Sequence, residues 1–155
     1  MVVGRQRTIY QKWRFRAEFD GIGSAVFAKV GPLEFASEVV KYNDGGAMIP
    51  HKELGMVEFS PITCERGSTE NDLLYEWALA ASNVAADRGA NPADYKRNGS
   101  IYQLDRAGNI VKTFRIYGAM PTKFKAGEWD NSANEAAVEE LELEYDYFET
   151  ESTPF

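Results

Sequence analysis

The chain has 155 residues, of which 24 are acidic and 17 are basic, so its formal net charge is −7. This length suffices for one domain with its own core. The net negative charge argues against a protein that binds nucleic acid through non-specific electrostatic attraction. Cys64 is the only cysteine, which excludes an intramolecular disulfide and a multi-cysteine zinc site.

The N-terminal segment, residues 1–11, has no clear periodicity and no apolar run behind its charges. It predicts an arm and not a signal peptide, and the polar segment 149–155 predicts a second arm. No stretch approaches the roughly 20 apolar residues of a membrane span. We therefore expect one domain over residues 1–155 with short terminal arms, made in the cytoplasm and without membrane contact.

The first strand is expected at residues 14–20, where Phe15, Ala17 and Phe19 alternate with charged residues. A second extended region covers residues 27–42. It should break at Gly31-Pro32, because proline has no N–H to donate to a neighbouring strand.

Residues 42–46 carry a strong turn signal, and no useful periodicity follows as far as residue 54. The segment 42–54 therefore predicts a long exposed loop. It holds His51, the only histidine, which a Ser-His-Asp arrangement would need; a solvated loop histidine is the simpler interpretation. His51 and Glu53 could offer two metal ligands, but no further ligand cluster at a recognised spacing accompanies them, so we expect no metal site.

Residues 56–66 are extended again, with a bulge expected at Ser60-Pro61 because the apolar parity changes there. Ser68 or Thr69 can then cap a helix, whose apolar residues follow at helical spacing from Leu73 to Val84. This is the one helix that we predict.

Two further strand-like runs, residues 100–104 and 109–117, are joined by a turn containing Gly108, and they predict a hairpin. Met120-Pro121 is expected to end the second run. Residues 123–130 have no pattern.

The last predicted element is a two-faced strand between residues 131 and 148. Apolar residues fall on one face, namely Ala137, Leu141, Leu143, Tyr145 and Tyr147, and acids fall on the other, namely Glu140, Glu142, Glu144 and Asp146. One face fits a core and the other fits water. Such a row of acids costs a few tenths of a kcal/mol per neighbouring pair, so its presence needs a reason.

No internal repeat is present, and six or seven strands with one helix predict a mainly β fold. Catalytic motifs are also missing. Paired carboxylates such as Glu139 and Glu140 are explained by a solvated strand face, while Gly21-Ile22-Gly23 and Gly45-Gly46 lack the surroundings of a nucleotide-binding loop. We therefore expect no enzyme and no cofactor.

Several segments, taken in their order and spacing, form a specific combination. They are residues 15–21, 39–46, 64–67 with 74–77, 105–117, and 118–121 followed by 134–147. The combination resembles the tail-tube family of contractile-tailed bacteriophages, which is similar in fold to the inner-tube proteins of type VI secretion and related injection systems.

The resemblance implies two packed antiparallel β-sheets, a β-sandwich or barrel, with one flanking α-helix. It also implies hexameric rings that stack into a hollow tube within the virion tail, through which DNA passes without adhering. Sheath, baseplate, tape-measure and tail terminator proteins would be the partners. The alternatives are a secreted ring-forming tube protein of a type VI or related system, a tube-initiating baseplate protein and, from another class, a small ligand-binding β-sandwich.

The resemblance gives the acidic face a hypothesis. If Glu140, Glu142 and Glu144 point into the lumen, they repel the phosphates of DNA, and the genome slides through the channel. The alternative is that this face meets outer solvent or the sheath, and parity leaves the choice open.

The resemblance also implies that the loop at residues 42–54 reaches the neighbouring ring. Its candidate contact residues are Asn43, Asp44, Met48, Ile49, His51, Lys52 and Glu53. Met48 and Ile49 have no evident core role, so they would bury against the next ring. A floppy surface loop is the alternative.

Overall fold

Alternating apolar residues build two antiparallel sheets that share one long strand. The computed structural model describes residues 14–21, 27–68, 72–82, 96–127, 129–132 and 134–152. Its elements, in chain order, are β1 (Phe15–Phe19), β2 (Lys29–Gly31), β3 (Phe35–Tyr42), β4 (His51–Phe59), β5 (Ile62–Gly67), α1 (Leu73–Ser82), β6 (Arg97–Leu104), β7 (Ile110–Lys125), β8 (Val138–Glu144) and β9 (Tyr147–Ser152). Within these ranges, no helix is long and apolar enough to cross a membrane.

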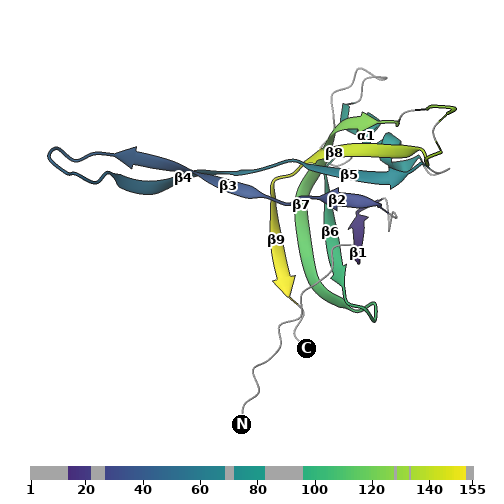
Figure 1. Cartoon of the computed structure of the whole chain (residues 1–155), viewed down its shortest axis with the longest axis horizontal. Helices are drawn as coiled ribbons and strands as arrows, with labels where there is room; N and C mark the ends of the chain where they lie inside the picture. Colours follow the sequence, from purple (N-terminus) through teal and green to yellow (C-terminus); the bar gives the residue numbers. More distant parts are fainter. Residues whose placement is uncertain are drawn as a thin grey trace, which may run out of the picture.

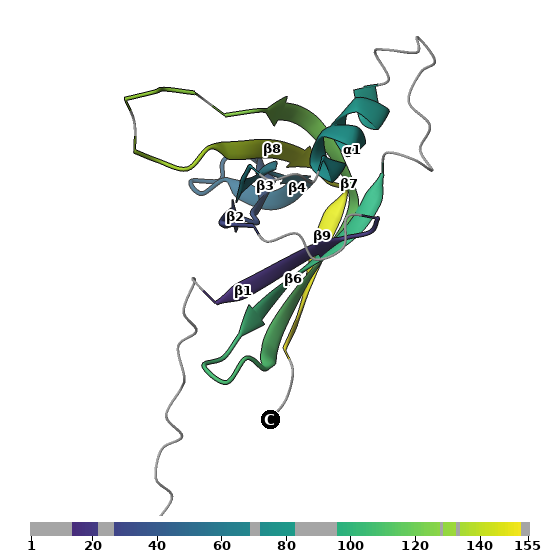
Figure 2. The same cartoon turned by 90° about the vertical axis from the view of Figure 1, so that its right-hand side faces the viewer.

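The two sheets meet at β7. Sheet 1 has the order β1-β6-β7-β9 and sheet 2 has the order β7-β8-β5-β2, with all neighbours antiparallel. Residues 112–117 of β7 pair with β9, and its C-terminal part pairs with β8. Gly118 lies between these two stretches at a φ of +69°, a conformation that glycine adopts readily, and there β7 passes from one sheet into the other (Figures 1 and 2).

The core lies between the sheets and under α1. Leu74 and Trp77 of α1 are fully buried, and the centroids of the Trp77 and Phe19 rings are 5.5 Å apart. The other buried core residues are Ala17, Phe27, Ile62, Cys64, Ile116, Ala119, Leu141, Leu143 and Tyr145. The predicted fold class, two packed antiparallel sheets with one flanking helix, is confirmed.

The segment predicted as a long loop is a β-hairpin, so that prediction is wrong for residues 51–54. β4 begins at His51 and pairs with β3 from Tyr42 back to Phe35, leaving only residues 43–50 as the turn. We call residues 35–59 the arm, because they project far from the rest of the domain (Figure 1).

The prediction of one continuous C-terminal strand is also wrong. β8 ends at Glu144 and β9 begins at Tyr147, because the chain turns at Asp146, whose backbone N–H donates to the carbonyl of Tyr117 at 2.9 Å. Residues 149–152, predicted as part of an arm, pair with β7 as β9. The face assignment within β8 is confirmed, since Leu141 and Leu143 are buried while Glu140, Glu142 and Glu144 are not.

Two predicted ends of elements are wrong as well. β7 does not stop at Pro121 but continues to Lys125, with a register shift between Pro121 and Lys123 that accommodates the missing N–H. Ser60 and Pro61 form no bulge within one strand; they separate β4 from β5.

The predicted helix is confirmed, but its cap is not. α1 begins at Leu73, directly after Asp72, whose carbonyl accepts a 2.9 Å hydrogen bond from the N–H of Glu76. Ser68 therefore lies too early to be the cap. Thr69, Val84 and the predicted N-terminal arm lie outside the described residues.

Candidate functional site

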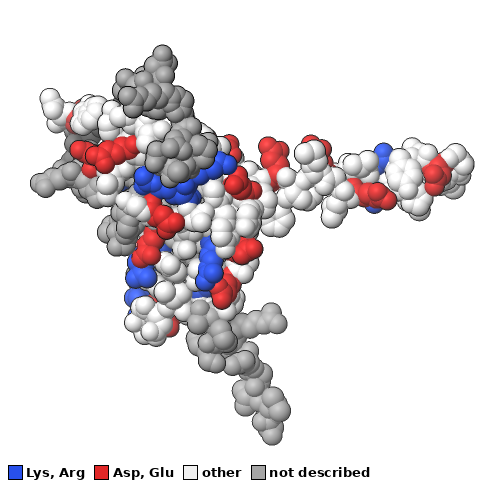
Figure 3. Space-filling view, turned by 180° about the vertical axis from the view of Figure 1, so that it is seen from behind, with Lys and Arg blue, Asp and Glu red and all other residues white. Residues whose placement is uncertain are grey.

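The arm is apolar, yet little covers it. Its exposed large apolar side chains are Phe35, Val39, Val40, Tyr42, Met48, Ile49, Leu54, Met56 and Val57. Met48 is 99% exposed and Ile49 79% exposed, both in the turn. Figure 3 shows the arm as a mostly uncharged projection. An isolated two-stranded hairpin is only marginally stable, and an exposed apolar surface of this kind marks an interaction site.

Aromatic packing joins the arm to the body. The Phe35 and Phe59 rings lie 5.5 Å apart at the base, and each lies within 6 Å of the Phe148 ring of β9. Phe59 also lies 6.0 Å from the Tyr145 ring. This cluster anchors the base of the arm and leaves its far end without support from the body.

The predicted contact residues of this segment are all exposed, but they split between two elements. Asn43, Asp44, Met48 and Ile49 lie in the turn, whereas His51, Lys52 and Glu53 begin β4. His51 stacks on Tyr42 with ring centroids 5.2 Å apart, and its Nε2 lies 3.2 Å from Oδ2 of Asp44. His51 thus closes the hairpin, and the described residues contain no cluster suited to a metal ion.

Sheet 1 has two open edges. β1 and β9 are its outermost strands, and among the described residues no other strand pairs with their outer sides. Sheet 2 differs: β2 spans only three residues, and α1 packs against β7, where the Tyr75 and Phe124 rings lie 5.7 Å apart. An unpaired edge offers backbone hydrogen-bonding groups to another strand, so sheet 1 can be extended at both of its edges.

The outer face of sheet 1 carries charges that pair with each other. Arg115 lies 3.1 Å from Glu151, and Arg16 lies 3.2 Å from Glu18. The Tyr117 hydroxyl donates to Glu149 at 3.3 Å. On the body of the molecule, positive and negative side chains are interspersed (Figure 3), so this face offers no large field of one sign.

The structure explains the row of acids on β8. Glu140, Glu142 and Glu144 are half-buried on the outer face of sheet 2. The strand register sets Lys125 opposite Glu140 and Lys123 opposite Glu142. Opposite charges on neighbouring strands attract, so these lysines offset part of the repulsion expected from sequence, while Glu65 of β5 lies opposite Glu140 on its other side. The sequence pattern could not reveal these partners, since β7 was predicted to end before them.

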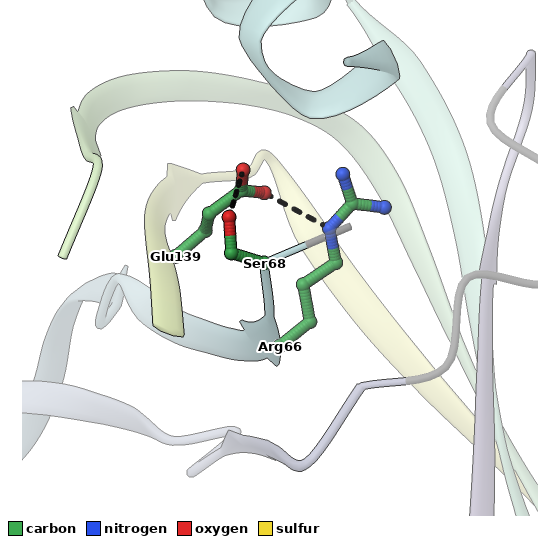
Figure 4. Close-up of polar contacts among 3 residues, drawn as sticks. All are labelled: Arg66, Ser68 and Glu139. Carbon is green, nitrogen blue, oxygen red and sulfur yellow. Dashed lines mark hydrogen bonds and ion pairs between the residues drawn. The ribbon is translucent and has the colours of Figure 1, made fainter. Parts of the chain in front are cut away.

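Glu139 points to the other side of β8 and has a structural role. Its Oε2 accepts a hydrogen bond of 3.1 Å from Nε of Arg66, whose side chain is only 4% exposed. The Ser68 hydroxyl donates to the other carboxylate oxygen, Oε1, over 3.5 Å (Figure 4). Glu139 and Glu140 therefore face opposite sides of sheet 2 and do not form a carboxylate pair.

Cys64 is fully buried within sheet 2. Burial raises the pKa of its thiol to about 12, because a thiolate would lose its hydration there. The thiol therefore stays protonated and unreactive at neutral pH.

The comparisons with known proteins identify a family by sequence and a shared fold by structure. A family model described as T4-like virus tail tube protein gp19 matches residues 11–149. No curated protein matches the chain in sequence.

Solved structures share its fold. A chain in the structure of the anti-feeding prophage tube-terminating cap aligns with a TM-score of 0.82 and 21% identity over 99% of this chain and 97% of that one. A chain of the sheath-tube complex of an extracellular contractile injection system, PVC, aligns at 0.79 and 22%, covering 94% and 93%. Hcp1 from Flavobacterium johnsoniae aligns at 0.62 and 17%, covering 92% and 98%.

Proposed function

Because the chain belongs to the T4-like virus tail tube protein family, we propose that it forms hexameric rings that stack into the hollow tube of a contractile phage tail. Its role is structural, as a tube subunit. The tube lies inside a contractile sheath in the virion, starts at a baseplate and ends at a terminator, with a tape-measure protein inside it. On DNA ejection it provides the channel.

The main support for assembly into a ring is the pair of open edges on sheet 1. Its four strands alternate in direction, so the two edge strands, β1 and β9, run antiparallel to each other. Copies repeated around an axis would therefore continue the alternation across each junction. A closed ring leaves no free edge, and six copies of four strands would enclose about 24 strands, more than the 16 to 18 that already leave an aqueous channel in porins.

Such a ring places the outer face of sheet 1 around the channel, since the inner face packs on the core. Arg16 and Arg115 on this face already have carboxylate partners. Guanidinium groups paired in this way hold DNA phosphates less strongly than free ones would. The channel is therefore non-adhesive because its charges are balanced.

In this arrangement Glu140, Glu142 and Glu144 face away from the channel, which is the alternative that the sequence left open. Replacing all three with glutamine is expected to leave the rate of DNA ejection from assembled particles unchanged. The matched variant carries Glu18→Gln and Glu151→Gln on the outer face of sheet 1 and should slow ejection, because Arg16 and Arg115 then lose their carboxylate partners. Slower ejection from the first variant alone would restore the lumen hypothesis for β8.

Stacking of the rings is assigned to the arm, whose exposed turn would bury Met48 and Ile49 against the next ring. Single rings without tubes would result from any change that removes this apolar contact.

The ring is tested by negative-stain electron microscopy of the purified protein, with its mass in solution measured on the same sample. Hollow six-fold rings or tubes, with masses at multiples of the hexamer, are expected. A uniform monomer at micromolar concentrations would contradict self-assembly of this chain.

A second candidate function is the inner tube of an injection system that carries protein cargo. The likeness to the anti-feeding prophage cap and to a chain of the PVC sheath-tube complex favours it. The content of assembled particles separates the two functions. DNA in the particles supports the phage tail, and particles with protein cargo but no DNA support the injection system.

A further inference from the structure

The two open edges of sheet 1 carry charges at defined positions: Arg16 and Glu18 on β1, and Glu149 and Glu151 on β9. We propose that β9 of one copy pairs with β1 of the next in the register that sets Glu149 opposite Arg16, and that this ion pair selects the register of the ring. The inference rests on the ring assembly proposed above and names the contact between its subunits.

The charged residues of both edges lie on the same face of sheet 1. The strand register connects Arg16 through Tyr102 and Thr113 to Glu151, and Glu18 through Ser100 and Arg115 to Glu149. The opposite face of the same strands carries Ala17, Phe19 and Phe148, which belong to the core or pack against it.

This division of faces removes half of the registers. A shift by one residue would turn the charges of β9 towards the core face of β1 and Phe148 towards the charged face. Only even shifts keep charge beside charge and apolar beside apolar.

Electrostatics then selects among the even shifts. With no shift, Glu151 lies opposite Arg16 but Glu149 lies opposite Glu18, which are like charges. A shift by two residues in one direction sets Glu151 opposite Glu18 and carries Arg16 beyond the end of β9. The shift by two in the other direction sets Glu149 opposite Arg16 and Tyr147 opposite Glu18. Opposite charges across strands are favourable and like charges are not, so the last register is preferred.

The same register also suits the core face and the ring. It sets the small side chain of Ala17 opposite the large one of Phe148, which lets the two strands pack closely. The offset of two residues per copy tilts the strands against the ring axis, as closed barrels require. Larger even shifts leave too few residues of β1 and β9 side by side to pair.

Disulfide trapping tests the register directly. The variant Glu18→Cys/Tyr147→Cys is oxidised and run on a non-reducing gel. The matched control is Phe15→Cys/Ser152→Cys, a pair that lies directly opposite only in the register without a shift. Both variants keep Arg16 and Glu149. Directly opposite residues lie within disulfide reach, and two residues along a strand add about 6.7 Å. Cys64 stays out of the reaction because it is buried. We expect covalent multimers up to the hexamer from the first variant and few from the second.

The possible outcomes distinguish the register, the β1–β9 junction and the ring function. Cross-linking of the control pair instead overturns the register. No cross-linking of either pair, in a protein that still forms rings by microscopy, overturns the β1–β9 junction and leaves the ring function standing. A wild-type chain that forms no rings overturns the function and this junction together.

Charge reversal gives a second readout that needs no oxidation. Arg16→Glu and Glu149→Arg should each raise the concentration needed for ring assembly by about tenfold or more, because each sets like charges across all junctions. The double variant should recover most of the loss. Double and single variants that assemble equally poorly, with unchanged melting of the monomer, would contradict a direct Arg16–Glu149 contact.

Discussion

Replacing Met48 and Ile49 with aspartate is expected to yield a folded protein that forms rings but no tubes. Both side chains are almost fully exposed in the turn of the arm, so their loss takes little from the stability of the subunit. Full burial of such a side chain contributes about 1.5–3 kcal/mol. Every ring would lose two such contacts per arm on all of its arms, and stacking should fail.

The measurement is the length distribution of tubes by electron microscopy, with sedimentation to count the subunits per particle. A matched control introduces aspartate at Gly45 and Ala47 of the same turn, both exposed, which adds the same charge but removes no large apolar group. This control should form tubes at a modestly higher concentration. Tubes of normal length from the Met48 and Ile49 variant would show that the turn does not join the rings.

The second large effect concerns stability. Glu139→Gln removes the negative partner of a guanidinium whose side chain is only 4% exposed, that of Arg66. Removing one member of a buried ion pair commonly destabilises a protein by 3–5 kcal/mol, and the partial exposure of Glu139 favours the lower end, about 3 kcal/mol. In a chain of this size that loss lowers the melting temperature by roughly 10 °C.

Glu140→Gln is the matched control, because Glu140 is the next residue of the same strand but lies on the outer face of sheet 2. Its melting temperature should change by no more than about 2 °C, as is usual for a charge on an outer sheet face that lies opposite a lysine. Thermal unfolding at concentrations that keep the protein monomeric compares the two. Equal melting of both variants would mean that the Arg66–Glu139 pair does not hold this end of sheet 2 together.

The sequence was informative wherever one face of an element is buried. The alternation in residues 14–20 and 138–144 correctly assigned Ala17, Phe19, Leu141 and Leu143 to the core, because a strand with one buried face needs a period of two. A period of two does not identify the strands of the arm. Apolar side chains are exposed on both strands of the arm, and its register shifts between Ser37 and Val39. No single buried face therefore imposes a regular period, and the first part of β4, residues 51–54, is not predicted from the sequence.

The position of one turn and the charge partners of β8 were not predictable from the sequence. Asp146 looked like one more acid on an outer face, but the chain turns there into β9, and that turn depends on the carbonyl of Tyr117. Lys123 and Lys125 follow a proline that was expected to end a strand, so nothing in their local pattern placed them beside Glu142 and Glu140. Local patterns cannot report a contact between strands that are distant in the chain.

The sequence by itself determined the fold class, one helix, the inward residues of β1 and β8, and the resemblance to tail-tube proteins, since these depend on periodicity, turn chemistry and the order of segments. Only the tertiary structure decided that the arm projects, that β1 and β9 are the open edges, and that the acids of β8 have lysine neighbours. Those features depend on which strands pair and in what register, and pairing is set by burial across the whole core.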